Sequence, residues 1–354
     1  TKATLALTGD SGTRTGNPSM YDHHASQDGI NRLPVEHGNA ICYSGYREGQ
    51  SPVDAIYPSY DEIREDLSIL AGNWQFLRVY DSGRHAELVL DVIRREGLSF
   101  HLMLGLDLAA EVSNPHCPWG AEYSDETLAA NREHNHDQVQ RAIALANQYP
   151  DIVFAVSVGN EASVEWTDHM VPVERLIEHV QQLRRAIRKP VTFCENYVPW
   201  TYKLEPLAAE LDFLSVHTYP AWEYRSMEDA LEYTKQNYHS VADHYPDKPV
   251  IITEAGWTTA SNGRGIDPWN ASEELQARYY GELMDWTTRE SILTFVFEAF
   301  DEPWKGSPDP DEPEKHWGLF NLDRTPKLVM RDLYGDRLPA PEPASREADA
   351  TSQA

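Results

Sequence analysis

The 354-residue sequence predicts an α/β protein built as one (β/α)8 TIM barrel. Short, nearly continuous apolar segments alternate with longer amphipathic segments, the pattern of a parallel sheet covered by helices. No glycine-rich phosphate-binding fingerprint follows any apolar segment, which disfavours a doubly wound open sheet. The number of alternating units, eight, suits closure into a barrel.

The expected strands are short apolar runs that end close to polar or acidic residues. They are Ala40–Tyr46, Phe76–Asp81, Ser99–Asp107, Ile152–Glu161, Val191–Tyr197, Phe213–Tyr219, Val250–Gly256 and Ile292–Asp301. Amphipathic periodicity predicts helices at Tyr60–Ala71, Ala86–Arg95, Glu126–Gln148, Val173–Ile187, Met227–Asp243, Glu273–Thr288 and Lys327–Leu333, with a weak, short one at Leu204–Leu211. Ser59 and Glu62 form a capping-box pattern at the start of the first helix.

The segment Ile152–Glu161 indicates how its side chains are divided between two faces. Ala155 and Ser157 share one face with Glu161, and such small residues suit a crowded barrel interior. The opposite face is bulky, with Phe154 among its members, and is expected to pack on helices. The acidic residue stands at the carboxyl end of the strand, which is the edge where barrel enzymes carry their chemistry.

The two ends of the chain differ in composition from its centre. Residues 1–38 are polar and lack periodicity, so we expect an irregular N-terminal arm. Residues 39–337 form the expected catalytic barrel. Residues 338–354 consist largely of Pro, Ala and charged or small polar residues, which predicts a disordered tail.

Charge and hydropathy exclude several classes of partner. The chain has 30 Lys and Arg against 57 Asp and Glu, a formal charge of −27 that would be repelled by phosphate backbones and anionic lipids. No apolar run approaches the roughly 18 residues of a membrane span. We therefore expect neither nucleic acid nor a membrane as partner, whereas a small molecule or a neutral polymer is compatible. The three cysteines form no disulfide framework.

Three of the expected strands end in acidic residues at the same edge of the barrel. These stretches are Asn160-Glu161, Thr253–Trp257 with Glu254, and Phe297–Glu302. An unpaired buried carboxylate is costly, so a single such residue could be a helix cap or an ion pair, but several in one barrel favour function. Two carboxylates on either side of a sugar ring are the catalytic groups of glycosidases, one as acid and one as nucleophile.

At these residues the chain resembles glycoside hydrolase family 17, the β-1,3-glucanase family within a clan of retaining (β/α)8 enzymes. Asn160-Glu161 and the Thr-Glu-Ala-Gly-Trp stretch match the ends of the family's fourth and seventh strands. Phe297–Lys305 (FEAFDEPWK), followed by HWGLF, is similar to the family's FEMFDE-x-WK and HFGLF motifs. Ile41–Arg47 and Leu77–Tyr80 resemble its opening strands. The HTYPAW stretch and the proline- and acid-rich loop Pro303–Glu314 depart from the plant pattern and suggest a bacterial-type or fungal branch.

The resemblance implies roles for individual residues. Glu161 would be the general acid/base, and Glu254 the nucleophile that forms a covalent glycosyl-enzyme. Asn160 would bind the substrate 2-hydroxyl, Tyr219 would hydrogen-bond the nucleophile, and Arg78 would keep it ionised.

Further candidates surround these residues. Glu302 and Lys305 match the family's acid and lysine pair and would support the acid. Substrate contacts are expected from a histidine and from aromatic side chains, because sugar faces stack on flat rings. These substrate-binding candidates are Tyr46, His217, Trp257, Trp304, Trp200 and Trp222. No HExxH pattern occurs, and we expect neither a metal nor another cofactor.

The sequence therefore predicts a monomeric, retaining glycoside hydrolase that cleaves laminarin-type β-1,3-glucan, with endo action expected rather than exo action. One alternative is a β-1,3-glucan transglycosylase, elongating or branching, which would use the same fold and the same two glutamates. A second alternative is a catalytically silent carbohydrate-binding barrel. A polymeric substrate implies a secreted or periplasmic location, although the sequence begins without a recognisable leader.

Overall fold

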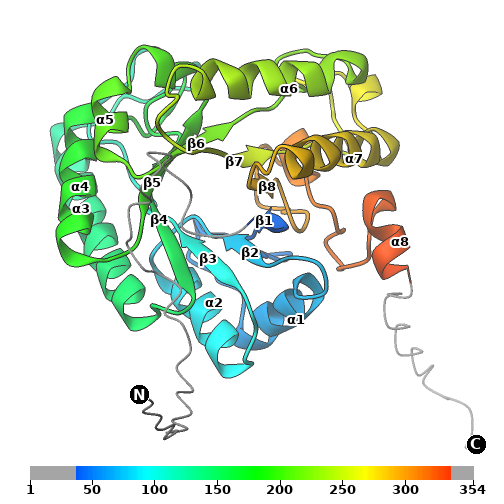
Figure 1. The fold of residues 1–354 in the computed structure, drawn as a ribbon, viewed down its shortest axis with the longest axis horizontal. Helices are drawn as coiled ribbons and strands as arrows, with labels where there is room; N and C mark the ends of the chain where they lie inside the picture. Colours follow the sequence, from blue (N-terminus) through cyan, green and yellow to red (C-terminus); the bar gives the residue numbers. More distant parts are fainter. Residues whose placement is uncertain (1–36, 336–354) are drawn as a thin grey trace, which may run out of the picture.

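The computed structural model describes residues 37–335, which form a closed parallel barrel. Its strands pair in the order β1-β2-β3-β4-β5-β6-β7-β8, and β8 returns to pair with β1. Figure 1 shows the strands around a central axis with the helices outside them. The predicted (β/α)8 fold class is confirmed. Nearly all of the predicted arm (1–38) and all of the predicted tail (338–354) lie outside the described residues.

Every strand lies within a segment that the sequence predicts, but most are shorter at the carboxyl end. At that end the last residues leave the sheet's hydrogen-bond ladder and turn into the loops that carry the site. The strands are β1 Ala40–Cys42, β2 Phe76–Arg78, β3 His101–Leu104, β4 Val153–Asn160, β5 Val191–Asn196, β6 Leu214–His217, β7 Val250–Ala255 and β8 Thr294–Val296.

The helices follow the amphipathic segments closely. They are α1 Tyr60–Leu70, α2 Arg84–Arg95, α3 Asp125–Gln148, α4 Val173–Ala186, α5 Glu205–Glu210, α6 Met227–Ala242, α7 Glu273–Arg289 and α8 Arg331–Tyr334. The capping box is present, since the Ser59 hydroxyl accepts from the Glu62 amide at 3.3 Å and the Glu62 carboxylate accepts from the Ser59 amide at 2.7 Å. The expected last helix is divided into a 3₁₀ turn at Leu328–Met330 and the short α8.

Irregularities in β4 decide which of its side chains enter the barrel. The Phe154 ring stacks on Phe295 of β8 at a centroid distance of 6.4 Å and meets Phe76 of β2 at 5.4 Å. Because β4 and β8 stand on opposite sides of the barrel, Phe154 points inward, and the expectation that it packs on helices is wrong. Gly159 has a φ of 96°, a left-handed value that favours glycine. The register with β5 shifts there, so that Asn160 pairs with β5 at the edge of the barrel.

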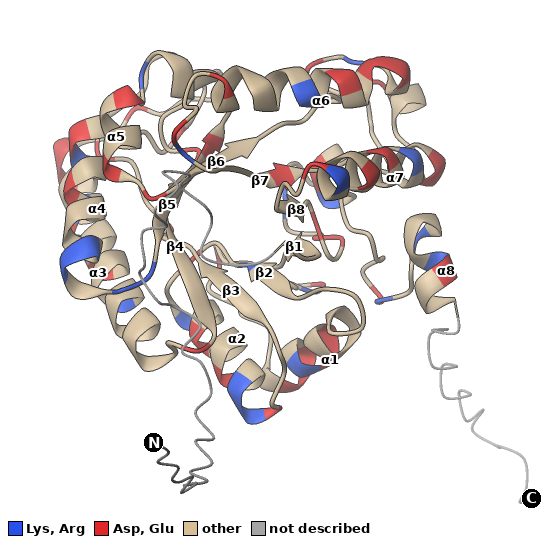
Figure 2. Cartoon of the chain, in the orientation of Figure 1, with Lys and Arg blue, Asp and Glu red and all other residues tan. Residues whose placement is uncertain are grey.

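Acidic residues are spread over the outer helices and are not gathered at one of them (Figure 2). Over residues 37–335, none of the helices has the length and apolar character that a membrane crossing requires.

Candidate active site

Two glutamates meet at the carboxyl edge of the barrel around one histidine. Glu161 directly follows β4, Glu254 lies in β7, and His217 ends β6. The His217 Nδ1 atom lies 2.9 Å from Oε1 of Glu161 and 3.4 Å from Oε2 of Glu254. One carboxylate oxygen of each glutamate and one ring nitrogen of the histidine all lie within 4.8 Å of one another. The two carboxylates are therefore close enough to act on one sugar.

Donors surround the Glu254 carboxylate on both oxygens. Its Oε1 accepts from Arg78 Nη1 at 2.6 Å and from the Tyr80 hydroxyl at 2.8 Å, and its Oε2 accepts from the Tyr219 hydroxyl at 2.6 Å. Burial alone would raise the pKa of Glu254. The charges of His217 and Arg78, together with the two tyrosine hydroxyls, instead lower it to about 2. Glu254 is thus an ionised carboxylate with a fixed orientation.

Arg78 connects the nucleophile candidate to the neighbouring asparagine. Its guanidinium is buried and donates to Oδ1 of Asn160 and to the Thr253 carbonyl at 3.2 Å, in addition to Glu254. The guanidinium also lies 4.4 Å from the centre of the Tyr80 ring. A single arginine in the barrel interior therefore sets the positions of Glu254 and Asn160 together.

Glu161 has a different environment from Glu254. Its side chain is 28% exposed, against 7% for Glu254, so it can exchange a proton with solvent. Its backbone has a φ of 47°, in the left-handed region, and its amide donates to the Cys194 carbonyl at 2.9 Å. His169 contacts the residue before Glu161, since its Nε2 atom lies 2.8 Å from the Asn160 carbonyl oxygen. Glu254 is therefore shielded from solvent, whereas Glu161 is accessible to water.

Glu302 and Lys305 belong to a second, buried charge cluster. Lys305 Nζ lies 2.8 Å from Oε2 of Glu298 and 3.4 Å from Oε2 of Glu302. Both glutamates are buried, so these residues are not an exposed loop pair. Burial and the charge of Glu302 raise the pKa of Glu298. Glu298 was among the strand-end acids in the sequence, but nothing in the sequence distinguished it from its acidic neighbours.

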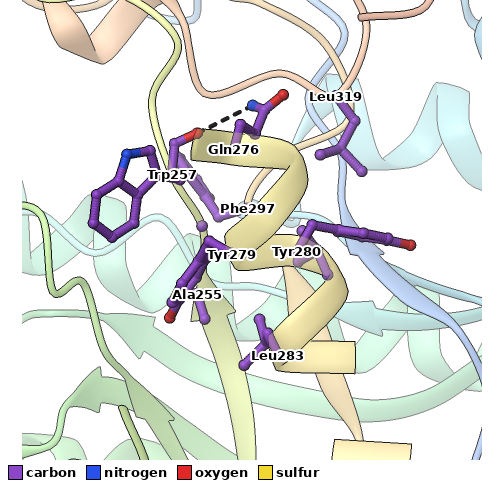
Figure 3. A pocket seen from close by; sticks show the side chains of 10 residues that line it. Ala255, Trp257, Gln276, Tyr279, Tyr280, Leu283, Phe297 and Leu319 are labelled. Carbon is purple, nitrogen blue, oxygen red and sulfur yellow. Dashed lines mark hydrogen bonds between the residues drawn. The ribbon is translucent and has the colours of Figure 1, made fainter. Parts of the chain in front are cut away.

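Several predicted substrate-binding residues are corrected by their burial. Trp200 and Trp257 are 0% and 1% exposed, so their faces cannot stack on a sugar. The Trp257 indole donates to the Asn270 carbonyl at 2.8 Å, and the Gln276 amide donates to the Trp257 carbonyl at 3.0 Å. Figure 3 shows that contact in a small pocket lined by α7 residues and by residues at the ends of β7 and β8. His217 is likewise fully buried and bridges the two acids instead of facing solvent.

Of the other aromatic candidates, Tyr46 is buried as well, whereas Trp304 and Trp222 are partly buried. Tyr46 is buried and stacks on His85 at 5.3 Å. Trp304 is partly buried, and its ring centroid lies 6.0 Å from that of Tyr46. Its indole N–H donates to Oε2 of Glu302 at 2.6 Å. Trp222 is partly buried and lies 6.0 Å from Trp317.

Exposed aromatic side chains stand instead on the loops that follow β3 and β4. Trp119 is 63% exposed and Trp166 is 41% exposed. The Asn114 side-chain amide donates to the carbonyls of Glu165 and Thr167, both at 2.7 Å, and so joins the two loops. The loops that carry the two tryptophans are therefore joined, and the loop of Trp166 also carries Glu161. A sequence pattern cannot show this, because exposure depends on the packing of loops distant in sequence.

The cluster of Glu161, His217 and Glu254 also has the spacing of a metal site. A cation would need free carboxylate lone pairs. Both oxygens of Glu254 already accept hydrogen bonds, and the Arg78 guanidinium 2.6 Å away would oppose a second positive charge. The donor set therefore favours proton chemistry over metal binding.

We expect the free energy of unfolding to depend on pH through this cluster. Burial would lower the pKa of His217, but Glu254, a hydrogen bond with Cys194, and Glu161 raise it from 6.5 to about 10. Protonated His217 therefore contributes stability that is complete below pH 6.5 and is lost as the pH rises through 10. Glu254, with its lowered pKa, contributes stability that is present above pH 4.5 and is lost as the pH falls through 2.

Denaturant unfolding of the wild type and of His217→Asn at several pH values checks this expectation. The stability difference between the two proteins should be largest near pH 6 and should shrink toward pH 10. A difference that stays constant over this range would contradict a charged His217.

A (β/α)8 barrel with two carboxylates around one imidazole at its carboxyl edge defines the class of glycoside hydrolase barrels. Residues 40–318 match the family model of the BtgE/BtgC glycoside hydrolase domain, and the chain belongs to this family. The match confirms the glycoside hydrolase resemblance that the sequence motifs predicted.

Individual proteins of this kind can be compared with the chain. The glucan 1,3-beta-glucosidase of Arthroderma benhamiae is 26% identical over 189 residues, which are 50% of this chain and 61% of that protein. An endo-laminarinase from Formosa Hel1_33_131 has a TM-score of 0.72 and 29% identity, covering 84% of this chain and 87% of that one.

A glycoside hydrolase family 17 beta-1,3-glucanosyltransferase from Rhizomucor miehei shares the fold, with a TM-score of 0.63 and 21% identity, covering 82% of this chain and 96% of that one. The chain spans between 42% and 61% of the length of the first curated relatives it matches.

Proposed function

We propose that the chain is a retaining hydrolase of β-1,3-glucan, with Glu254 as nucleophile and Glu161 as general acid/base. The observation that carries the proposal is the carboxylate pair, because its two members lie within reach of one sugar but in opposite environments. A short separation of about 5–5.5 Å between the carboxyl groups is typical of retaining enzymes. The names of the relatives and the endo-laminarinase support β-1,3-glucan as the substrate.

The first step of the reaction would form a bond between Glu254 and the anomeric carbon. Glu161 donates its proton to the glycosidic oxygen as that bond breaks, and the leaving sugar departs as an alcohol. Arg78 donates to Oδ1 of Asn160, which leaves the Nδ2 group of the amide as the donor for the 2-hydroxyl of the substrate. Tyr219 orients Glu254 for attack.

The second step would release the sugar with its original configuration. Glu161, now ionised, takes a proton from water, and the resulting oxygen nucleophile displaces Glu254 from the anomeric carbon. His217 contacts both carboxylates and keeps them at a fixed separation while the charge moves from one to the other. Glu302 and Lys305 would support the acid from the neighbouring cluster.

The stereochemical course tests the proposal directly. Proton NMR during the first minutes of laminari-oligosaccharide hydrolysis should show the β-anomer of the new reducing end before mutarotation. Release of the α-anomer would contradict a covalent intermediate on Glu254. A wild type that leaves every β-glucan intact, like its Glu254→Gln variant, would favour the silent binding barrel.

Transglycosylation is the second candidate function, and the exposed side chains of Trp119 and Trp166 on the loops after β3 and β4 favour it. A sugar stacked there would lie on the side of the acid/base and could replace water in the second step. Chromatography of laminaripentaose digests distinguishes the two activities. Products longer than the substrate would establish transfer, and shorter products alone would establish hydrolysis.

We expect Trp119→Ala to raise KM for laminari-oligosaccharides by roughly 3- to 10-fold, with a smaller change in kcat, because a ring contact is worth about 0.5–1.5 kcal/mol. Trp269→Ala is the matched comparison, since Trp269 is 68% exposed but lies on the loop between β7 and α7, on the Glu254 side. Equal effects of the two substitutions would contradict a platform specific to the acid/base side.

We further propose that the chain acts as a monomer in a secreted or periplasmic setting. The location is inferred from the polymeric substrate. Gel filtration at micromolar concentration tests the oligomeric state, and fractionation of the source cells tests the location.

A further inference from the structure

Glu195, the fifth residue of β5, is a buried carboxyl that the reaction steps above do not use. It is 0% exposed. Its Oε2 accepts from the Ser163 amide at 2.9 Å and from the Ser163 hydroxyl at 2.7 Å, while its Oε1 accepts from the Asn196 amide at 2.7 Å. These three donors are neutral. A carboxyl that is fully buried on neutral donors is uncommon unless its charge or its proton has a use.

The hydrogen bonds of β5 fasten the turn that carries Glu161. The Glu161 amide donates to the carbonyl of Cys194, which precedes Glu195. The Glu195 carboxylate holds Ser163, two residues after Glu161, and Lys203 Nζ donates to the Ser163 carbonyl at 2.5 Å. Glu161 has a left-handed φ of 47°, which a free chain would leave readily, so the turn needs these contacts on both sides.

We propose that Glu195 is a positioning residue for Glu161, which fixes the turn after β4 and acts on the proton of Glu161 through its own negative charge. The inference rests on the proposed function, in which Glu161 is the acid/base.

The charged groups around Glu195 include the acid/base candidate. Glu161, His217, Lys203 and Tyr202 face Glu195. Burial and the charge of Glu161 raise the pKa of Glu195 to about 7, against the opposing effect of its hydrogen bonds and of His217. The two carboxyls therefore interact electrostatically across the paired strands β4 and β5.

Glu161 has further charged neighbours besides Glu195 and His217, namely His169 and Glu314. Among these neighbours, Glu195 is the carboxyl that also holds the turn by hydrogen bonds, so its replacement changes both the charge beside Glu161 and the support of its turn.

The pH profile of kcat/KM on laminari-oligosaccharides tests the proposal. In Glu195→Gln the repelling charge is gone, so the alkaline limb should move to lower pH by about 1 unit. Lys203→Met removes a positive charge close to the two carboxyls, so the alkaline limb of its pH profile should move to higher pH. Glu195→Asp keeps the charge and weakens the hydrogen bonds, so kcat should fall while the limb stays in place.

A purely structural role predicts different results. Thermal unfolding first establishes that each variant is folded at the assay temperature. Aryl β-laminaribiosides with good and poor leaving groups then separate the roles, because only poor leaving groups need the proton of Glu161. Above its own alkaline limb, Glu195→Gln should lose roughly 10-fold more activity on poor than on good leaving groups.

The outcomes are distinct for the two proposals. Suppose that the wild type is active, that Glu195→Gln and Lys203→Met keep its alkaline limb, and that activity falls equally on both kinds of leaving group. This result would overturn the role of Glu195 but not the proposed function. A folded wild type that is silent on every β-glucan would overturn the proposed function, and the role of Glu195 with it.

Discussion

Glu254→Gln is expected to lower kcat on laminari-oligosaccharides by roughly 10⁴-fold or more, because the amide cannot form the glycosyl-enzyme. The substitution keeps the shape of the side chain and leaves room for substrate, so binding should be retained. Stopped assays of reducing ends measure the loss, and calorimetric titration with laminarihexaose measures the binding. A variant with a tenth of the wild-type rate would contradict the assignment of the nucleophile.

The matched control is Glu111→Gln. Glu111 is also a buried glutamate with an arginine partner, since its Oε2 accepts from Arg175 Nε at 2.7 Å, but it lies away from the carboxylate pair. Its loss should lower the free energy of unfolding, because the buried His179 and the partly exposed Arg175 then lose their carboxylate partner. The rate on glucan should change far less than in Glu254→Gln. A comparable loss of rate in both variants would mean that instability, not chemistry, explains the first result.

Glu161→Ala should lose roughly 10²- to 10⁴-fold in kcat/KM on natural glucan, because the leaving oxygen is no longer protonated. Dinitrophenyl β-laminaribioside has a leaving group that needs no proton, so its first step should be nearly as fast as in the wild type. The glycosyl-enzyme would then accumulate, and mass spectrometry of the intact protein should detect it.

Azide provides the confirming measurement for this variant. The small anion can enter the space of the missing carboxylate and displace Glu254 without a base, which should restore turnover and yield a β-glycosyl azide. An α-glycosyl azide would instead indicate that Glu161 is the nucleophile and that the two roles are reversed.

The sequence was informative where local patterns decide the structure. The eight strands, their order and the acidic residues at their carboxyl ends follow from apolar runs and punctuation, and the structure contains all of them. The position of Glu161 relative to Glu254 depends on closure of the barrel, which the alternation of strands and helices predicts. These features could be read before any coordinates were known.

The sequence was less informative where contacts between distant segments decide the structure. The inward position of Phe154 depends on an irregularity in β4 that alternation cannot reveal. Trp257 and Trp119 both follow strands, yet one is buried under α7 and the other is exposed. Glu195 has no motif around it, and its connection to Glu161 exists only because β4 and β5 are neighbours in the barrel.

The rings of Phe76, Phe154 and Phe295 have a consequence for how the site handles protons. They lie together inside the barrel and form an apolar layer below the carboxylates. We expect protons to reach the site from the carboxyl edge, where the Glu161 side chain is 28% exposed and that of Glu254 is 7% exposed. Glu161 can therefore exchange its proton with solvent between turnovers, while Glu254 carries its negative charge in the free enzyme and gives it up only during its covalent bond to the sugar.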